Sequence, residues 1–119
     1  MVWKSRKDLR MDKKTLLRDA PQNLIEAFYE SLQASGIAVD EIIMFGSYAK
    51  KTFRPDSDLD LCVISNKFGN NSFEEMMALT KISSKIDPMI EAHPYNRRDL
   101  NNKFDPLAKE ITNFGIKVI

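Results

Sequence analysis

Residues 45–64 read FGSYAKKTFRPDSDLDLCVI, and the interpretation of the whole chain starts from this stretch. In its second half, Asp58 and Asp60 alternate with Leu59 and Leu61. Period-two alternation is typical of a β-strand, so both aspartates would leave one face of the strand and both leucines the other. Two neighbouring carboxylates repel each other, and a divalent cation that prefers oxygen ligands offsets that repulsion.

The first half of the stretch predicts a phosphate-binding turn. Gly46 and Ser47 follow an apolar run and open a short helical turn, whose free N–H groups suit a phosphate. Glycine allows close approach of the backbone, and the serine hydroxyl adds a donor. Three cations follow that either bind phosphate or belong to a solvated loop: Lys50, Lys51 and Arg54.

Taken alone, an acidic pair on a strand is also typical of an edge strand whose charges block aggregation. The phosphate-binding turn beside the pair favours a catalytic site instead. Together the two halves predict phosphoryl-type transfer, in which positioning and charge neutralisation supply most of the catalysis.

Helix signals flank this stretch on both sides. Pro21 suits the first position of a helix that ends at Gly36, and Asp105 suits the N-cap of a last helix. Between them, Ser72 and Glu75 form a capping box that opens a helix. We expect that helix to bury one apolar face, made of Phe73, Met76, Leu79, Ile82 and Ile86.

Strand signals alternate with these helices. Apolar runs of strand length predict strands over residues 39–45, 57–65 and 86–92, with a short terminal strand over residues 116–119. The order helix, strand, strand, helix, strand, helix predicts an α/β (α+β) fold with a small mixed β-sheet flanked by helices.

The composition is that of one globular domain: 119 residues, 43% hydrophobic and 29% charged. The single cysteine excludes an internal disulfide framework, and the single histidine, His93, excludes a His-rich metal site and reads as a loop residue before Pro94. Neither a signal peptide nor a transmembrane-length apolar run is visible, so we expect a cytoplasmic protein without membrane contact.

Charge is distributed unevenly along the chain. Residues 1–20 carry seven Lys/Arg and three Asp, a net +4, and residues 21–119 carry 11 basic and 14 acidic groups, a net −3. We therefore divide the chain into a basic N-terminal arm or helix, 1–20, and a single domain, 21–119. The near-neutral total of +1 does not favour nucleic acid as the main partner.

The residues GSYAKKTFRPDSDLD also resemble a known family. Ten residues separate Ser47 from Asp58, as in the GSx₁₀DxD signature of the DNA polymerase beta-like nucleotidyltransferase superfamily. Length and element order are similar to its minimal nucleotidyltransferase branch. The resemblance implies that residues 21–119 adopt the nucleotidyltransferase fold. It also implies transfer of a nucleoside monophosphate from an NTP, ATP first among them, to an acceptor hydroxyl with Mg²⁺ or Mn²⁺ and loss of pyrophosphate.

The resemblance assigns roles within the stretch. Gly46 and Ser47 would hold the β- and γ-phosphates, and Asp58 and Asp60 would bind two metal ions. Family members often have glycine where this chain has Lys51, so we expect a differently shaped loop there.

A third carboxylate is implied on the strand beside the aspartate pair. Asp87 occupies the corresponding place within residues 86–92, where it would bind the second metal and assist deprotonation of the acceptor. Pro88 is unusual in a central strand because it cannot donate to the sheet. Glu91 would face the same side of a regular strand and is the alternative third carboxylate.

Two functions of different classes follow. Minimal members of the family are often encoded beside a HEPN-type protein, as the antitoxin of a toxin–antitoxin pair, and some add AMP to a tyrosine of that partner. The first hypothesis is therefore an enzyme that acts on a partner protein. The alternative is a non-catalytic antitoxin or scaffold that binds its partner and keeps a nucleotide site as a relic or regulator.

Overall fold

The structure is a computed structural model that describes residues 13–119, with side chains from residue 21 onwards. Most of the basic arm, residues 1–12, lies outside the described residues. Within residues 13–119 no helix combines the length and the apolar character needed to span a membrane. The elements follow in the order α1 Lys13–Ala34, β1 Glu41–Phe45, α2 Ser47–Lys50, β2 Leu59–Ile64, α3 Ser72–Ile86, β3 Ile90–Tyr95, η2 Asp99–Asn101, α4 Pro106–Phe114 and β4 Ile116–Lys117.

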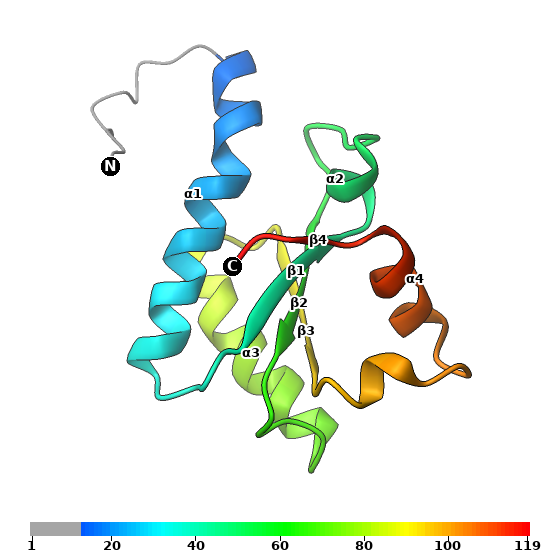
Figure 1. Cartoon of the computed structure of the whole chain (residues 1–119). Helices are drawn as coiled ribbons and strands as arrows, with labels where there is room; N and C mark the ends of the chain where they lie inside the picture. Colours follow the sequence, from blue (N-terminus) through cyan, green and yellow to red (C-terminus); the bar gives the residue numbers. More distant parts are fainter. Residues whose placement is uncertain (1–12) are drawn as a thin grey trace.

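The strands form one mixed sheet in the order β3-β2-β1-β4. β1 is antiparallel to both β2 and β4, and β2 is parallel to β3. Helices α1 and α3 cover one face of this sheet and α4 packs on the other, as Figure 1 shows. The predicted small mixed sheet flanked by helices is therefore confirmed.

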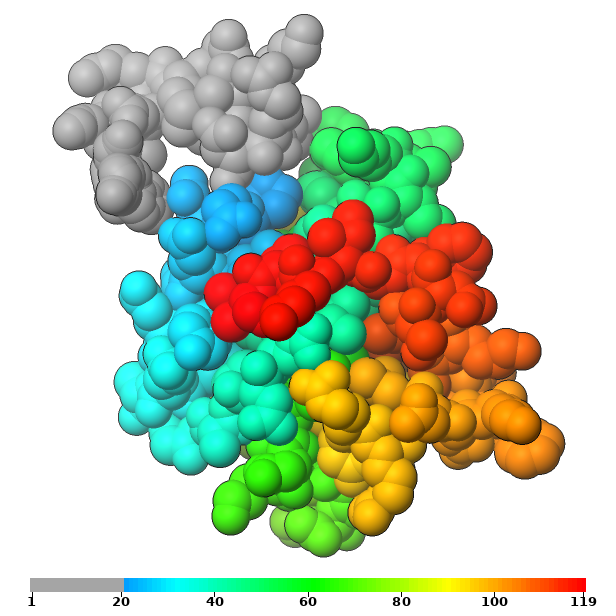
Figure 2. Space-filling model, in the orientation of Figure 1, coloured from blue at the N-terminus to red at the C-terminus, as the bar shows by residue number. Residues whose placement is uncertain are grey.

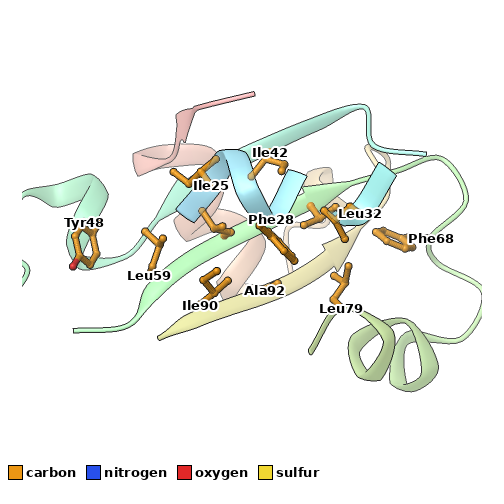
Figure 3. Close-up of a cluster of buried hydrophobic side chains, with 12 residues drawn as sticks. Ile25, Phe28, Leu32, Ile42, Tyr48, Leu59, Phe68, Leu79, Ile90 and Ala92 are labelled. Atoms are coloured by element: carbon orange, nitrogen blue, oxygen red, sulfur yellow. The ribbon is translucent and has the colours of Figure 1, made fainter. Parts of the chain in front are cut away.

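Alternation along β2 separates two apolar clusters. Leu59, Leu61 and Val63 point into the larger cluster, which also contains Phe28 of α1 and Leu79 of α3 (Figure 3). Cys62 and Ile64 point to the opposite face and pack with Phe45 and with Ile111 of α4. The predicted alternation of β2 is confirmed, and it leaves Asp60 on the α4 face.

Helix α1 begins earlier than the sequence predicts. It starts at Lys13, so Pro21 lies inside the helix instead of at its first position. An interior proline removes one helical hydrogen bond. The longer helix is consistent with Leu17, which stands seven residues before Leu24 and extends the apolar spacing toward the N-terminus.

Helix α3 is capped one residue earlier than expected. The Asn71 side chain accepts a hydrogen bond from the Glu74 N–H, so Asn71 and not Ser72 is the N-cap. The carboxylate of Glu75 accepts from the backbone N–H groups of residues 69–71. The expected burial of Phe73 is wrong, because this side chain is 74% exposed.

Strand β3 begins at Ile90, four residues later than the sequence predicts. Helix α3 continues to Ile86, and its C-cap is Asp87. Pro88 follows in the turn, where its missing N–H does not interrupt the sheet. A second proline, Pro94, lies inside β3, which is the outer strand at this side of the sheet.

The end of the chain adds the short strand that the sequence predicts. Residues 116–117 pair with β1, and the backbone N–H of Val118 donates to the Ile42 carbonyl. In Figure 2 this last segment crosses the surface over β1. It completes the sheet on the side opposite β3.

The loop after β1 contains the one non-glycine residue of the described chain with positive φ. Lys51 is the C-cap of α2, with φ 61° and ψ 33°, the left-handed conformation that glycine adopts at low cost. The position where this chain has Lys51 and family members often have glycine therefore has a backbone conformation that favours glycine.

We predict that Lys51→Gly stabilises the protein. Relief of left-handed strain is worth roughly 1–2 kcal/mol, and the greater freedom of glycine in the unfolded chain removes part of it. A net gain of up to about 1 kcal/mol raises Tm by roughly 4 °C, measured by thermal unfolding. Lys51→Ala keeps the Cβ and is the control, and an equal Tm for the two variants would contradict this account.

Candidate active site

Gly46 lies directly against the carboxylate of Asp60. In the antiparallel pairing of β1 with β2, Phe45 is opposite Asp60, and Gly46 is the next residue. Its φ of 73° and ψ of −151° are essentially restricted to glycine. A Cβ at this position would collide with Oδ2 of Asp60. The structure therefore brings the two halves of residues 45–64 into contact, at Gly46 and Asp60.

Asp60 also meets Glu91 of the neighbouring strand. The parallel pairing of β2 with β3 places these two residues opposite each other. Their carboxyl groups share a hydrogen bond. One ligand atom each from Asp60, Glu91 and His93 lie within 4.8 Å of one another.

The pKa of Asp60 reflects this crowding. Burial is the largest cause that raises it, and the hydrogen bond and charge of Glu91 come next, followed by the charges of Asp58 and Glu110. Together they raise the pKa of Asp60 to about 7. Burial lowers the pKa of His93, although the charge of Glu91 acts in the opposite direction. The lowered pKa favours the neutral imidazole, which is the form that can bind a metal.

The other two predicted acids lie at different distances from this cluster. Asp58 is exposed and stands one residue before β2, close enough for its charge to act on Asp60. Asp87 is not on β3: its Oδ1 accepts a hydrogen bond of 2.9 Å from the Met89 N–H, and its charge acts on Tyr48. The predicted strand position of Asp87 is therefore wrong, and Glu91 stands beside Asp60 instead.

The phosphate-binding turn has the predicted form. Ser47 is the first residue of α2, and the Gly46 carbonyl accepts from the Lys50 N–H at 3.1 Å. The first N–H groups of such a turn have no acceptor within it. Lys51 and Arg54 are exposed, and neither forms an ion pair with a described side chain.

Lys50 is engaged with helix α4. Its Nζ lies 2.9 Å from Oε2 of Glu110 and 4.9 Å from the centre of the Phe114 ring. The side chain of Lys50 is 41% exposed, so water screens this pair and the interaction is of the weak surface type. A phosphate near the turn would compete with Glu110 for the lysine.

A pocket of about 420 Å³ lies between the Gly-Ser turn, the acidic cluster and helix α4. Gly46 and Asp60 line one side, and Glu91 and His93 line another. Helix α4 closes it with Pro106, Leu107 and Glu110. Within the described residues, this pocket is where the phosphate-binding turn meets the acidic cluster.

The donor set fits a divalent cation. Carboxylate oxygens suit Mg²⁺ and Mn²⁺, and an imidazole beside them is better suited to Mn²⁺ than to Mg²⁺. Burial and the neighbouring acids raise the pKa of Asp60, so its ionised form is disfavoured when only protein groups surround it. A cation bound to Asp60 and Glu91, with Asp58 at the rim, would compensate that charge.

Two residues of the pocket were missed or set aside by the sequence analysis. His93 was read as a loop residue, yet it lies on β3 and shares a face with Glu91; its spacing of two from that glutamate was the available signal. Glu110 had no such signal, because only the packing of α4 against the sheet brings it to Lys50.

Comparisons with known proteins agree with this geometry. A family model described as the nucleotidyltransferase domain matches residues 23–114. No curated protein matches the sequence significantly. Among solved structures, the fold is similar to a chain in the crystal structure of a toxin–antitoxin with AMP-PNP, with a TM-score of 0.55 and 21% identity over 82% of this chain and 72% of that chain.

At 21% identity the likeness to that structure concerns the fold alone. The family match spans the phosphate-binding turn, the aspartate pair and β3, and it confirms the resemblance carried by the GSx₁₀DxD signature. The chain therefore belongs to the nucleotidyltransferase domain family.

Proposed function

We propose that this protein transfers a nucleoside monophosphate from an NTP, ATP first among them, to a hydroxyl group of a partner protein. The contact between Gly46 and Asp60 supports the proposal, because the first residue of the Gly-Ser turn lies against a carboxylate whose pKa is raised and whose charge a bound cation would compensate. Such a pairing suits in-line displacement at a phosphorus atom.

In this proposal the turn binds the nucleotide. Gly46 and Ser47 offer backbone N–H groups and a hydroxyl to the β- and γ-phosphates. Lys51 and Arg54 are exposed near the turn and neutralise further phosphate charge. Lys50 joins them when it exchanges Glu110 for a phosphate oxygen.

The carboxylates form the second half of the site. Asp58, Asp60 and Glu91 would hold Mg²⁺ or Mn²⁺, with His93 as a further ligand. Bound metal would neutralise the phosphates and lower the pKa of the attacking hydroxyl. Glu91, which stands where the third carboxylate is expected, accepts the proton of that hydroxyl. The attack breaks the bond to pyrophosphate, which leaves.

A partner protein is supported by the family branch and by the fold. Minimal members of this branch are often encoded beside a HEPN-type protein, as antitoxins, and the similar solved chain belongs to a toxin–antitoxin structure with AMP-PNP. We therefore propose a HEPN-type toxin as the acceptor. The alternative, a scaffold that neutralises the partner by binding alone, differs in that it needs no transfer.

We predict that label from the α-phosphate of an NTP passes to the partner in the presence of Mg²⁺ or Mn²⁺. Asp60→Asn abolishes the transfer. Glu91→Gln lowers its rate by about 100-fold or more, because a general base is lost, whereas Asp87→Asn retains most of it. Autoradiography of the separated proteins measures each rate.

The comparison of Glu91→Gln with Asp87→Asn decides which of the two residues is the third carboxylate. Loss of transfer in Asp87→Asn but not in Glu91→Gln would return the role to Asp87. If wild type labels no partner, while wild type and Asp58→Asn/Asp60→Asn neutralise the toxin equally, the scaffold alternative replaces the enzyme.

A second prediction concerns pH and metal. Folding raises the pKa of Asp60 from 3.8 to about 7. Ionisation of Asp60 therefore lowers the free energy of unfolding as the pH rises from about 4, and this loss reaches its full size above about pH 7. Without metal, Asp60→Asn therefore raises Tm at pH 8 and has little effect near pH 4. Mg²⁺ or Mn²⁺ raises the Tm of wild type at pH 8 but not that of the variant.

The matched control for this measurement is Asp56→Asn, which removes an exposed carboxylate from the loop before β2. It should change Tm equally at both pH values. A wild-type Tm that does not respond to either metal at pH 8 would contradict the proposed metal site.

A third prediction tests the close contact. Gly46→Ala lowers Tm and abolishes nucleotide binding, because the new Cβ meets Asp60 and the backbone conformation is strained by roughly 1–3 kcal/mol. Near pH 4, where substitution of Asp60 by itself is expected to have little effect on Tm, Gly46→Ala/Asp60→Ala removes the collision but keeps the backbone strain, so it should recover part of the lost Tm. Equal Tm values for the two would show that the contact is not limiting.

A further inference from the structure

A second and larger hollow adjoins the active-site pocket. Its volume is about 620 Å³, and it lies between the first turn of α3, the end of β3 and residues 99–107. His93 and Leu107 line both this hollow and the active-site pocket. The two spaces are therefore adjacent, and we call the larger one the side groove.

One face of β3 leads from the carboxylates into the side groove. Glu91, His93 and Tyr95 alternate with inward residues on this strand, so their side chains share the face that carries the site. Glu91 lines the pocket, His93 lines both spaces and Tyr95 lines the groove. Two strand residues span roughly 6–7 Å and four span roughly 13 Å, so an extended ligand beside His93 reaches Glu91 with about two residues and one beside Tyr95 with about four.

The charge of the side groove excludes phosphates. Glu75, Asp99 and Asp105 line it, and none of its lining residues is Lys or Arg. Burial acts to raise the pKa of Glu75, but hydrogen bonds from three backbone N–H groups together lower it, which favours the ionised carboxylate. Asp99 is exposed and forms no ion pair with any described side chain. A nucleotide or a nucleic-acid backbone would be repelled here, whereas a cation would be attracted.

The groove also has apolar walls and an apolar rim. Phe73, Met76 and Leu107 line it. Phe73 is 74% exposed, and Met77, one helical turn further along the same side of α3, is 55% exposed. Phe104, between η2 and α4, is 92% exposed. Exposed aromatic residues and methionines that adjoin a groove are typical of protein interfaces and exceed what a small acceptor molecule would cover.

We propose that the side groove binds a segment of the acceptor protein in which a lysine or arginine stands next to an apolar or aromatic side chain. The cation pairs with Asp99 and the apolar side chain packs on Phe73. The acceptor hydroxyl, about two to four residues away along the extended segment, then enters the pocket at His93. The inference rests on the proposed function for the hydroxyl transfer, but binding in the groove does not require transfer.

A positional-scanning library of short fluorescent peptides, each with one tyrosine, tests this specificity by fluorescence polarisation with the full chain and no nucleotide. Mixtures with a fixed Arg or Lys, or a fixed Leu or Phe, should bind about 10-fold tighter than mixtures with a fixed Asp or Glu. Equal binding of the acidic mixtures, or displacement of a cationic peptide by a single-stranded oligonucleotide, would overturn the proposal.

Matched variants assign the preference to the groove. Phe73→Ser should weaken binding about 10-fold and remove the apolar preference, and Asp99→Asn should remove the cationic preference. Phe114→Ser and Glu74→Gln change an exposed aromatic residue and an exposed acid outside the groove, and both should bind like wild type. All four positions are exposed, so folding should be retained. Unchanged preferences in Phe73→Ser and Asp99→Asn would overturn the proposal.

Asp60→Asn separates the groove from the chemistry. This variant should bind the peptides like wild type while it transfers no label. If wild type binds cationic apolar peptides through Phe73 and Asp99 but labels no acceptor, the groove stands and the proposed function fails. If wild type labels its partner, and Phe73→Ser and Asp99→Asn label limiting partner equally fast, the proposed function stands and the groove proposal fails.

Discussion

The contact between Gly46 and Asp60 is the constraint on which the rest of the site depends. β1 and β2 are paired so that Phe45, the last residue of β1, is opposite Asp60 of β2. Position 46 then lies against the Asp60 carboxylate and has no room for a side chain. That residue is also the first of the phosphate-binding turn. A single missing Cβ thus brings together the nucleotide half and the carboxylate half of the site, although fourteen peptide bonds separate Gly46 from Asp60.

The sheet can hold this cluster of carboxylates because its two faces carry different side chains. The face toward α1 and α3 carries only apolar side chains from β2, and it supplies most of the buried core. The face toward α4 carries a smaller apolar cluster at one end and the carboxylates at the other. Burial of Asp60, together with the neighbouring Glu91, Asp58 and Glu110, raises its pKa and opposes folding, while the opposite face stabilises the sheet that holds these groups.

Features encoded by local pattern could be predicted from the sequence, and features set by tertiary contact could not. Alternation gave the two faces of β2, and Asp105 followed by a proline gave the start of α4. The position of Glu91 depends on the parallel register with β2, which no local signal encodes, so Asp87 was placed on the strand although the turn holds it. The ion pair of Lys50 with Glu110 likewise needs α4 packed on the sheet.

Pro94 limits how another chain can approach β3. The carbonyl of Met89 accepts from Leu59 of β2, and that of Tyr95 accepts from Ser65, just after β2, so by alternation Ile90, Ala92 and Pro94 direct their backbone groups away from the sheet. Proline has no N–H to offer, and the Ile90 N–H already donates to Asp87. Only one outward donor is left along this edge, too few for a visiting strand to extend the sheet. A ligand of the side groove would therefore be recognised without main-chain pairing to the edge of β3.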